Sequence, residues 1–180
     1  LGAYRYDRYR RVKDAVELEV PEGADGAEVE RLVEAAYLAR DLVNTPANDL
    51  GPDALEKEIR TFAKRHKLDV KVIAGDDLLK ENFPMIHAVG RAAAEAPRLV
   101  DFSWGRRNDP KITLVGKGVT FDTGGLDIKP SSGMLLMKKD MGGAANVLGL
   151  AHAIIDAGLR VRLRVLIPIV ENAISGPAFR

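Results

Sequence analysis

The sequence predicts an α/β fold built on a layered sheet, part of it parallel. In the second half of the 180-residue chain, segments that alternate like strands follow segments with helical spacing. In the first half, apolar residues recur at the spacing of amphipathic helices. The composition is ordinary for a globular protein, with 46% hydrophobic and 29% charged residues. At this length we expect one domain, or one domain with a connecting piece.

The first half of the chain has a mainly helical pattern. The aromatic, basic segment LGAYRYDRYRR is interpreted as the last strand of an upstream unit, and an interaction tail is the alternative. Residues Pro21–Gly26 form a linker by composition. A helix is predicted over Ala27–Val43, and it ends at NTPAND because Pro46 disfavours helix at the preceding residue. A second helix begins near Pro52, and its buried stripe comprises Leu55, Ile59, Phe62 and Ala63.

The second half alternates strands and helices. DVKVIAG predicts a short strand, followed by a helical stretch near Asp76–Asn82. RLVDFSW and KITLVGK predict two strands, joined by GRRNDP as a hairpin connection. GGAANVLGLAHAIIDAG is apolar almost all round and predicts a buried helix that ends at Gly158. In the last strand, RVRLRVLIPIV, we interpret the alternating arginines as a solvated or interface-facing side rather than a phosphate-binding stripe; they are Arg160, Arg162 and Arg164.

Composition argues against several classes of protein. The formal net charge is +1, which gives no reason to expect nucleic acid or an acidic partner. The chain has no cysteine, so disulfide scaffolds and thiolate metal sites are excluded, and a reducing cytoplasm is expected. No apolar run approaches ~20 residues, so we expect no membrane span. Because the chain begins at Leu1 and stops just after a turn-like Ser175-Gly176-Pro177, we expect both ends to be cut.

Polar residues gather around glycines in VGKGVTFDTGGLDIKP, residues 115–130. Lys117 and Asp122 follow a predicted strand, and ligands of open α/β sheets gather at the carboxyl ends of strands. A second polar segment, MKKDMGG, precedes the predicted buried helix. Three interpretations compete for these residues: a phosphate-binding loop, surface salt bridges between lysines and aspartates, and a metal site.

The residues favour the metal site. A phosphate loop fails because Lys111 stands where the motif needs glycine and Gly118 where it needs serine or threonine. Salt bridges are disfavoured because flexible glycine-rich loops gain little from exposed ion pairs. Carboxylates suit Mg, Mn or Zn without a histidine, and a lysine ligates a metal only as the unusual neutral amine. The histidines lack metal-ligand spacing and are interpreted as surface or packing residues; they are His66, His87 and His152.

These polar segments resemble a known signature. VGKGVTFDTGGLDIKP followed by MLLMKKDMGGAANVLG is similar to the signature region of the M17 leucyl aminopeptidases, the cytosol aminopeptidase family. RDLVNTPAND and PIVENAISGPAFR resemble the family's flanking segments, so the resemblance covers about Arg40 to Arg180. It implies a three-layer mixed sheet flanked by helices. It also implies that residues 1–22 end a separate N-terminal domain, 23–43 form a connecting helix, and 44–180 begin the catalytic domain.

The resemblance implies a metal-dependent aminopeptidase that releases N-terminal residues, often leucine, from peptides through a water activated by two ions of Zn, Mn or Mg. Carried across, Lys117 is the amine ligand of the tighter metal, Asp122 bridges both metals, and Asp140 ligates the tighter one. Lys129 is the charged lysine that stabilises the oxyanion. Met137 lines the pocket for the first side chain of the substrate, which Lys129 and Asp122 also contact.

Other polar neighbours receive lesser roles. Asp127 is interpreted as structural, Lys138 and Lys139 as solvated or supporting residues, and Glu171 and Asn172 as residues that shape the site without ligating metal.

One part of the family signature is missing. The family has an NTDAEGR segment with two further acidic ligands and an arginine that holds a bicarbonate, and this sequence lacks that segment. We therefore expect a fragment of a longer enzyme that, alone, binds metal poorly and hydrolyses little. The family further implies a cytoplasmic homo-hexamer with no membrane or nucleic-acid partner. Two alternatives stay open: a DNA-binding regulator, for which the arginines of Tyr4–Lys13 and Arg160–Arg164 are the only candidates, and a non-catalytic scaffold subunit.

Overall fold

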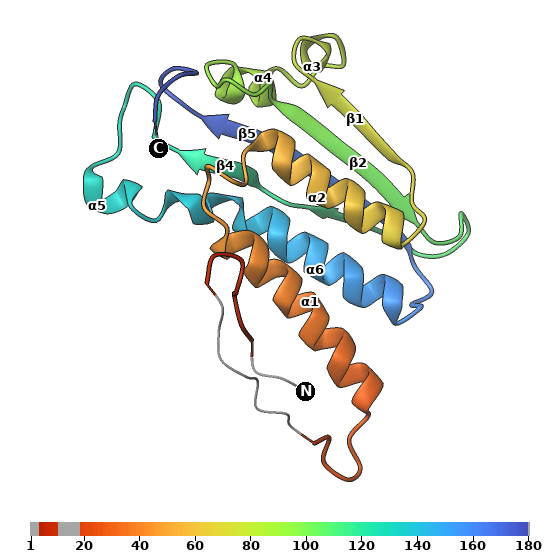
Figure 1. The fold of residues 1–180 in the computed structure, drawn as a ribbon. Coiled ribbons are helices and arrows are strands. Elements are labelled where there is room, and N and C mark those ends of the chain that lie inside the picture. The colour runs from red at the N-terminus through yellow and green to blue at the C-terminus, as the bar shows by residue number, and fades with distance from the viewer. Residues whose placement is uncertain (1–3, 11–18, 180) are drawn as a thin grey trace.

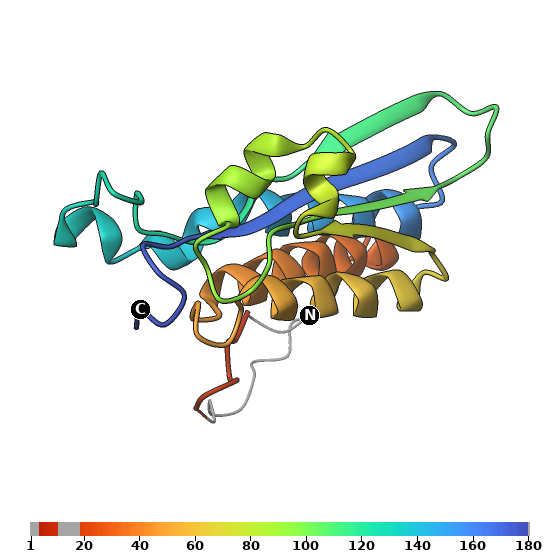
Figure 2. The same cartoon turned by 90° about the horizontal axis from the view of Figure 1, so that it is seen from above.

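A mixed sheet lies between two layers of helices in the computed structural model, which describes residues 4–10 and 19–179 (Figures 1 and 2). The sheet has five strands in the order β1-β2-β5-β3, and β4 also pairs with β5. β3 and β4 run parallel to β5, β2 runs antiparallel to β5, and β1 runs antiparallel to β2. The predicted three-layer mixed sheet is confirmed. The strands are β1 (Val70–Ala74), β2 (Arg98–Trp104), β3 (Lys111–Val115), β4 (Gly118–Asp122) and β5 (Arg162–Asn172).

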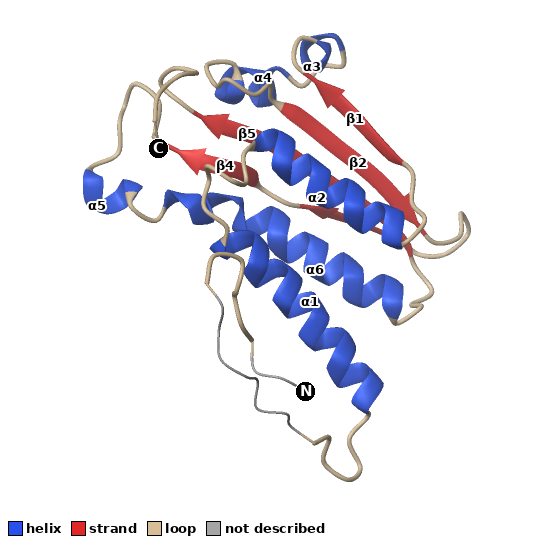
Figure 3. Cartoon of the chain, viewed as in Figure 1, coloured by secondary structure: helices blue, strands red, loops and turns tan. Residues whose placement is uncertain are grey.

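The long helices cover one face of the sheet and two short helices cover part of the other (Figures 2 and 3). The long ones are α1 (Gly26–Asn44), α2 (Pro52–Arg65) and α6 (Gly142–Asp156). The short ones on the opposite face are α3 (Asp77–Lys80) and α4 (Pro84–Gly90). Two further turns of helix, α5 (Ser131–Met134) and η1 (Met137–Met141), lead from β4 to α6. Within the described ranges, no helix is long and apolar enough to cross a membrane.

The bounds of α1 follow from local chemistry. The side chain of Asp25 accepts hydrogen bonds from the backbone N–H groups of Ala27 and Glu28, which would otherwise lack partners at the start of the helix. At the other end the hydroxyl of Thr45 donates to the carbonyl of Asp41, and Pro46 follows. The helix predicted over Ala27–Val43 is therefore confirmed to within one residue at each end.

The core forms where α2 and α6 pack on the sheet. Every second residue of β5 from Leu163 to Ile169 is fully buried, as are Leu55 and Ile59 of α2 and Leu148 of α6. Burying each such side chain stabilises the fold by roughly 1.5–3 kcal/mol. α1 does not reach the sheet in the same way and packs mainly against α6.

A buried arginine joins α2 to the sheet. Arg98, at the start of β2, is only 7% exposed. Its guanidinium pairs with Glu56 at 2.7 Å and with Asp53, both on α2, and donates to the carbonyl of Ala96 at 2.8 Å. All of its charge is therefore matched inside the protein, as a buried cation requires.

Three expectations from the sequence need correction. β2 and β3 do not form a hairpin, because β5 lies between them and pairs with both. The glycine-rich segment after β3 was predicted to be a loop, but it includes a strand, β4. Residues 4–10 form no strand and lie along α1, where the hydroxyl of Tyr4 donates to Asp41 at 2.8 Å; the remainder of LGAYRYDRYRR lies outside the described residues.

Candidate metal and substrate site

The candidate site lies where two parallel strands end. Asp122 is the last residue of β4, and its register partner is Asn172, the last residue of β5. Carboxyl ends of parallel strands meet at one edge of a sheet, which is where open α/β sheets bind ligands. The turn η1, which contains Met137 and Asp140, packs against β4. Sequence segments far apart in the chain therefore converge here.

One oxygen of Asp122 is held by hydrogen bonds. Oδ1 accepts from the backbone N–H of Gly124 at 2.9 Å and from the side-chain amide of Asn172 at 2.7 Å. Burial by itself raises the pKa of the Asp122 carboxyl, but these two donors and the Lys129 ammonium outweigh it and leave the pKa below its usual value. The carboxylate is thus kept ionised and fixed in orientation.

The loop after β4 turns back toward Asp122. Gly124 has a φ of 88°, and a Cβ there would lie 2.4 Å from the carbonyl oxygen of Asp127, so only glycine fits. The backbone N–H of Lys129 donates to the carbonyl of Thr123 at 2.9 Å and closes the loop. This closure brings the Lys129 ammonium to 3.4 Å from Oδ2 of Asp122.

Lys117 and Asp140 form a second pair. The Lys117 ammonium lies 2.7 Å from Oδ2 of Asp140, whose side chain is 13% exposed, whereas that of Lys117 is 58% exposed. Glycines allow this approach, because a Cβ on Gly143 would lie 2.9 Å from the backbone nitrogen of Lys117. The N–H of Ala144 donates to the carbonyl of Lys117 at 2.9 Å, which fixes the start of α6 against the loop before β4. The glycine at position 143 is therefore required for this close backbone approach.

The neighbouring residues are also placed. Met137 is half-buried at the start of η1, one turn before Asp140. Lys138 donates to the carbonyl of Asn44 at 2.7 Å, so it ties η1 to the end of α1 rather than being solvated. Asp127 is exposed on the loop after β4. Asn172, expected to shape the site, contacts Asp122 directly; the signal for this contact is the parallel register of β4 and β5, which sequence alone does not give.

Two of the histidines, His66 and His152, lie together away from the site. Nε2 of His66 is 3.2 Å from Nδ1 of His152, and Nε2 of His152 is 3.1 Å from a carboxylate oxygen of Glu34. His152 is buried, so both act as packing residues between α1, α2 and α6, as the sequence predicted of each. The arginines of β5 do not form one basic stripe, because Arg164 pairs with Asp101 through two hydrogen bonds of 2.6 and 3.1 Å.

The donor set fits a divalent cation in kind but not in number. Two carboxylates and an amine are hard or borderline donors suited to Mg, Mn or Zn. Within residues 4–10 and 19–179, no group of three or more histidine, aspartate or glutamate side chains is placed to hold a metal ion. Both lysine–aspartate pairs are also what the salt-bridge interpretation predicts. The choice between a metal site and simple salt bridges therefore depends on comparison with related proteins.

Comparison with known proteins decides the family. The model of the cytosol aminopeptidase family catalytic domain matches residues 37–180. This chain belongs to the cytosol aminopeptidase family. It is 41% identical over 154 residues to a probable cytosol aminopeptidase of Chlamydia trachomatis, a match covering 84% of this chain and 31% of that protein.

Solved structures of the family agree with this fold. The crystal structure of a cytosol aminopeptidase from Coxiella burnetii matches with a TM-score of 0.91 and 50% identity, covering 98% of this chain and 38% of that one. The bottromycin maturation enzyme BotP, in complex with Mn, matches with a TM-score of 0.85 and 44% identity, covering 98% of this chain and 39% of that one. The chain thus spans roughly a third of the length of these proteins.

Proposed function

We propose that this chain forms the first part of the catalytic domain of a metal-dependent aminopeptidase that releases N-terminal residues, leucine among them, from peptides. The observation that supports this best is the presence of two lysine–aspartate pairs, Lys117 with Asp140 and Lys129 with Asp122, beside β4 in a chain of the aminopeptidase family. The similar protein BotP, with 44% identity, is seen in complex with Mn.

The proposal gives each side chain a task. Asp122, Asp140 and Lys117 hold divalent metal, with Asn172 and Gly124 orienting the first carboxylate. The bound metal supplies Lewis-acid polarisation and an activated water. Lys129 keeps its charge near Asp122 and stabilises the developing oxyanion. Met137 contacts the first side chain of the substrate.

The same proposal includes inactivity of this chain alone. Two carboxylates leave a pair of dications under-ligated and the site too positive. We expect calorimetry to show weak Mn or Zn binding to residues 1–180, and we expect leucine p-nitroanilide to be hydrolysed little or not at all. Turnover comparable to that of a complete relative would refute this part. The hexamer, the bicarbonate and the cytoplasmic location implied by the family stay predictions.

A chimera tests the function itself. Residues 1–180 are joined to the part of the Coxiella burnetii enzyme that follows the matched region, since the two share 50% identity. We expect metal-dependent release of leucine from leucine p-nitroanilide. Asp122→Asn should lower the activity by at least about 100-fold, because loss of a ligand costs at least what loss of a supporting residue does. Lys129→Met should lower kcat by about 10²–10³-fold with KM little changed.

The matched control is Asp127→Asn. Asp127 is exposed on the same loop and has no assigned contact with the ions, so its loss should leave the activity of the chimera unchanged. A folded chimera without activity, or equal effects of Asp127→Asn and Asp122→Asn, would overturn the assignment. Unchanged activity in Asp122→Asn would favour the scaffold alternative instead.

A further inference from the structure

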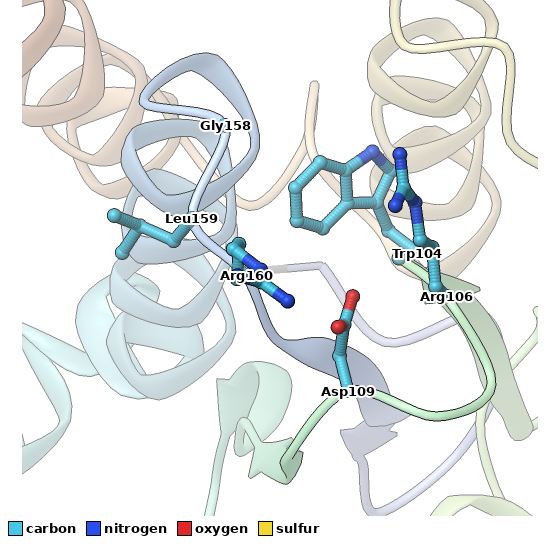
Figure 4. A pocket seen from close by; sticks show the side chains of 7 residues that line it. Trp104, Arg106, Asp109, Gly158, Leu159 and Arg160 are labelled. Carbon is cyan, nitrogen blue, oxygen red and sulfur yellow. The ribbon is translucent and has the colours of Figure 1, made fainter.

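A small pocket lies at the start of β5, whereas the candidate site lies at the other end of this strand. The pocket has a volume of about 260 Å³ and is enclosed by the end of β2, the loop before β3 and the turn between α6 and β5. Its walls include Trp104, Arg106, Asp109 and Arg160 (Figure 4). β5 is an 11-residue strand, and at about 3.3 Å per residue its two ends are roughly 30 Å apart. The pocket is therefore separate from the residues around Asp122.

The backbone around the pocket is tightly packed. Gly105 has a φ of 92°, and a Cβ there would lie 2.0 Å from the carbonyl oxygen of Val161. The N–H of Arg162 donates to the carbonyl of Pro110 at 2.8 Å, and the N–H of Asp109 donates to that of Arg106 at 3.1 Å. These contacts join the loop before β3 to the start of β5, so the hollow is preformed.

The charged side chains of the pocket face open space. In Figure 4 the Arg160 guanidinium and the Asp109 carboxylate are directed toward the same space, which the indole of Trp104 borders. Within the described ranges, Arg106, Asp109 and Arg160 make no ion pair and no side-chain hydrogen bond. By contrast, Arg98 and Arg164 on the neighbouring strands are both paired with acids.

The composition of the walls selects a ligand class. A guanidinium and a carboxylate that face one small space, those of Arg160 and Asp109, complement a molecule that has both an anionic and a cationic group. A phosphate dianion would meet the Asp109 carboxylate, which opposes it. The half-buried Trp104 ring offers an apolar surface and a π-face beside these charges. The volume lies just below the range of pockets for drug-sized ligands, which suits a molecule the size of one amino acid.

We propose that this pocket binds a free α-amino acid. The α-carboxylate pairs with the guanidinium group of Arg160, the α-ammonium pairs with Asp109, and an apolar side chain packs on the Trp104 indole. Free amino acids are also what the proposed aminopeptidase reaction releases, so the pocket would sense product; that last step alone rests on the proposed function, whereas binding does not.

Trp104 makes the test direct, because it is the only tryptophan of the chain. Intrinsic fluorescence of the 180-residue protein is followed while leucine is added, and we expect a saturable change. Asp109→Asn and Arg160→Gln should each weaken binding by about tenfold or more, the effect of losing one charge-assisted hydrogen bond. The matched control is Arg107→Gln, an exposed neighbour outside the pocket, which should leave the affinity unchanged. Calorimetry repeats the titration without relying on fluorescence, and circular dichroism checks that each variant is folded.

Ligand analogues separate the charge requirements. Leucinamide lacks the carboxylate and N-acetylleucine lacks the ammonium, so both should bind at least about tenfold more weakly than leucine. Inorganic phosphate should not compete. The absence of a saturable signal with leucine in both methods would overturn the proposal. So would equal binding of phosphate or N-acetylleucine, or an Arg107→Gln effect as large as that of Arg160→Gln. None of these readings depends on peptide hydrolysis, so the proposed function can fail or hold separately.

Discussion

Replacing Gly149 by alanine tests the close contact of α1 with α6, on which the whole N-terminal helix depends. A Cβ at position 149 would lie 2.6 Å from the carbonyl oxygen of Ala35, well inside the 3.4 Å at which ordinary contact begins. That neighbour is helix backbone and moves only if α1 shifts. Overpacking of this kind costs about 1–3 kcal/mol, whereas alanine gains about 0.5–1 kcal/mol over glycine within a helix. We expect a net loss of about 0.5–2 kcal/mol in the free energy of unfolding.

The same helix provides the control. A Cβ on Gly142, at the start of α6, would meet only a methyl group of Val43 at 3.9 Å. Gly142→Ala should therefore keep or raise the stability, by up to about 1 kcal/mol. Urea unfolding followed by far-UV circular dichroism measures both variants against the unchanged chain. The reasoning is refuted if Gly149→Ala is as stable as Gly142→Ala, because helix propensity favours alanine more at the interior position 149 than at the helix start, and only the space around the new methyl group opposes it.

Two further predictions concern charge inside the fold. Arg98→Met should lower the free energy of unfolding by about 2–4 kcal/mol, because it leaves the half-buried Glu56 carboxylate with only Arg60 beside it. The control is Arg60→Met, at an exposed position, which should lower the free energy of unfolding by under about 1 kcal/mol. Equal losses in the two variants would contradict this reasoning. Burial, with the charges of His152 and Arg65, lowers the pKa of His66. As the pH falls, His66 is therefore protonated in the unfolded chain before it is protonated in the folded chain, which favours the unfolded state. The urea midpoint should fall as the pH drops from about 7.5 to about 5.5, and it should fall less in His66→Phe.

Local patterns predicted the helices well because their causes are local. The apolar spacing of α2, with Leu55, Ile59 and Phe62 all buried, is visible in the sequence. So is the end of α1 before Pro46. The buried helix α6 was also expected, since glycine and alanine let it approach its neighbours.

Strand pairing was less accessible because it depends on the whole sheet. GRRNDP has the turn residues of a hairpin, yet β5 lies between β2 and β3 and pairs with both strands. The central position of β5 is stabilised by the burial of Leu163, Val165 and Ile167 under the long helices. Local sequence patterns do not predict this burial. β4 was not predicted for a related reason. The glycine-rich sequence around it is typical of a loop, although its buried Thr120 and its pairing with β5 define a strand.

The candidate site was predicted as a set of residues, but its internal arrangement was not. The signature placed Lys117, Asp122, Lys129 and Asp140 near one another, and the structure brings them into two ion pairs. Which lysine meets which aspartate follows from the loop closed at Gly124 and from the packing of η1 on β4. Neither can be read from spacing along the chain.

The two oxygens of Asp122 differ in a way that reconciles the salt-bridge and metal interpretations. Oδ1 accepts the hydrogen bonds of Gly124 and Asn172, which fix the orientation of the carboxylate. Oδ2 is the atom that faces the Lys129 ammonium at 3.4 Å. In the proposed function Asp122 would hold a divalent ion, and the neighbouring Lys129 ammonium would stabilise the charge that develops on a substrate carbonyl. A lysine–aspartate pair at this position is thus compatible with both interpretations.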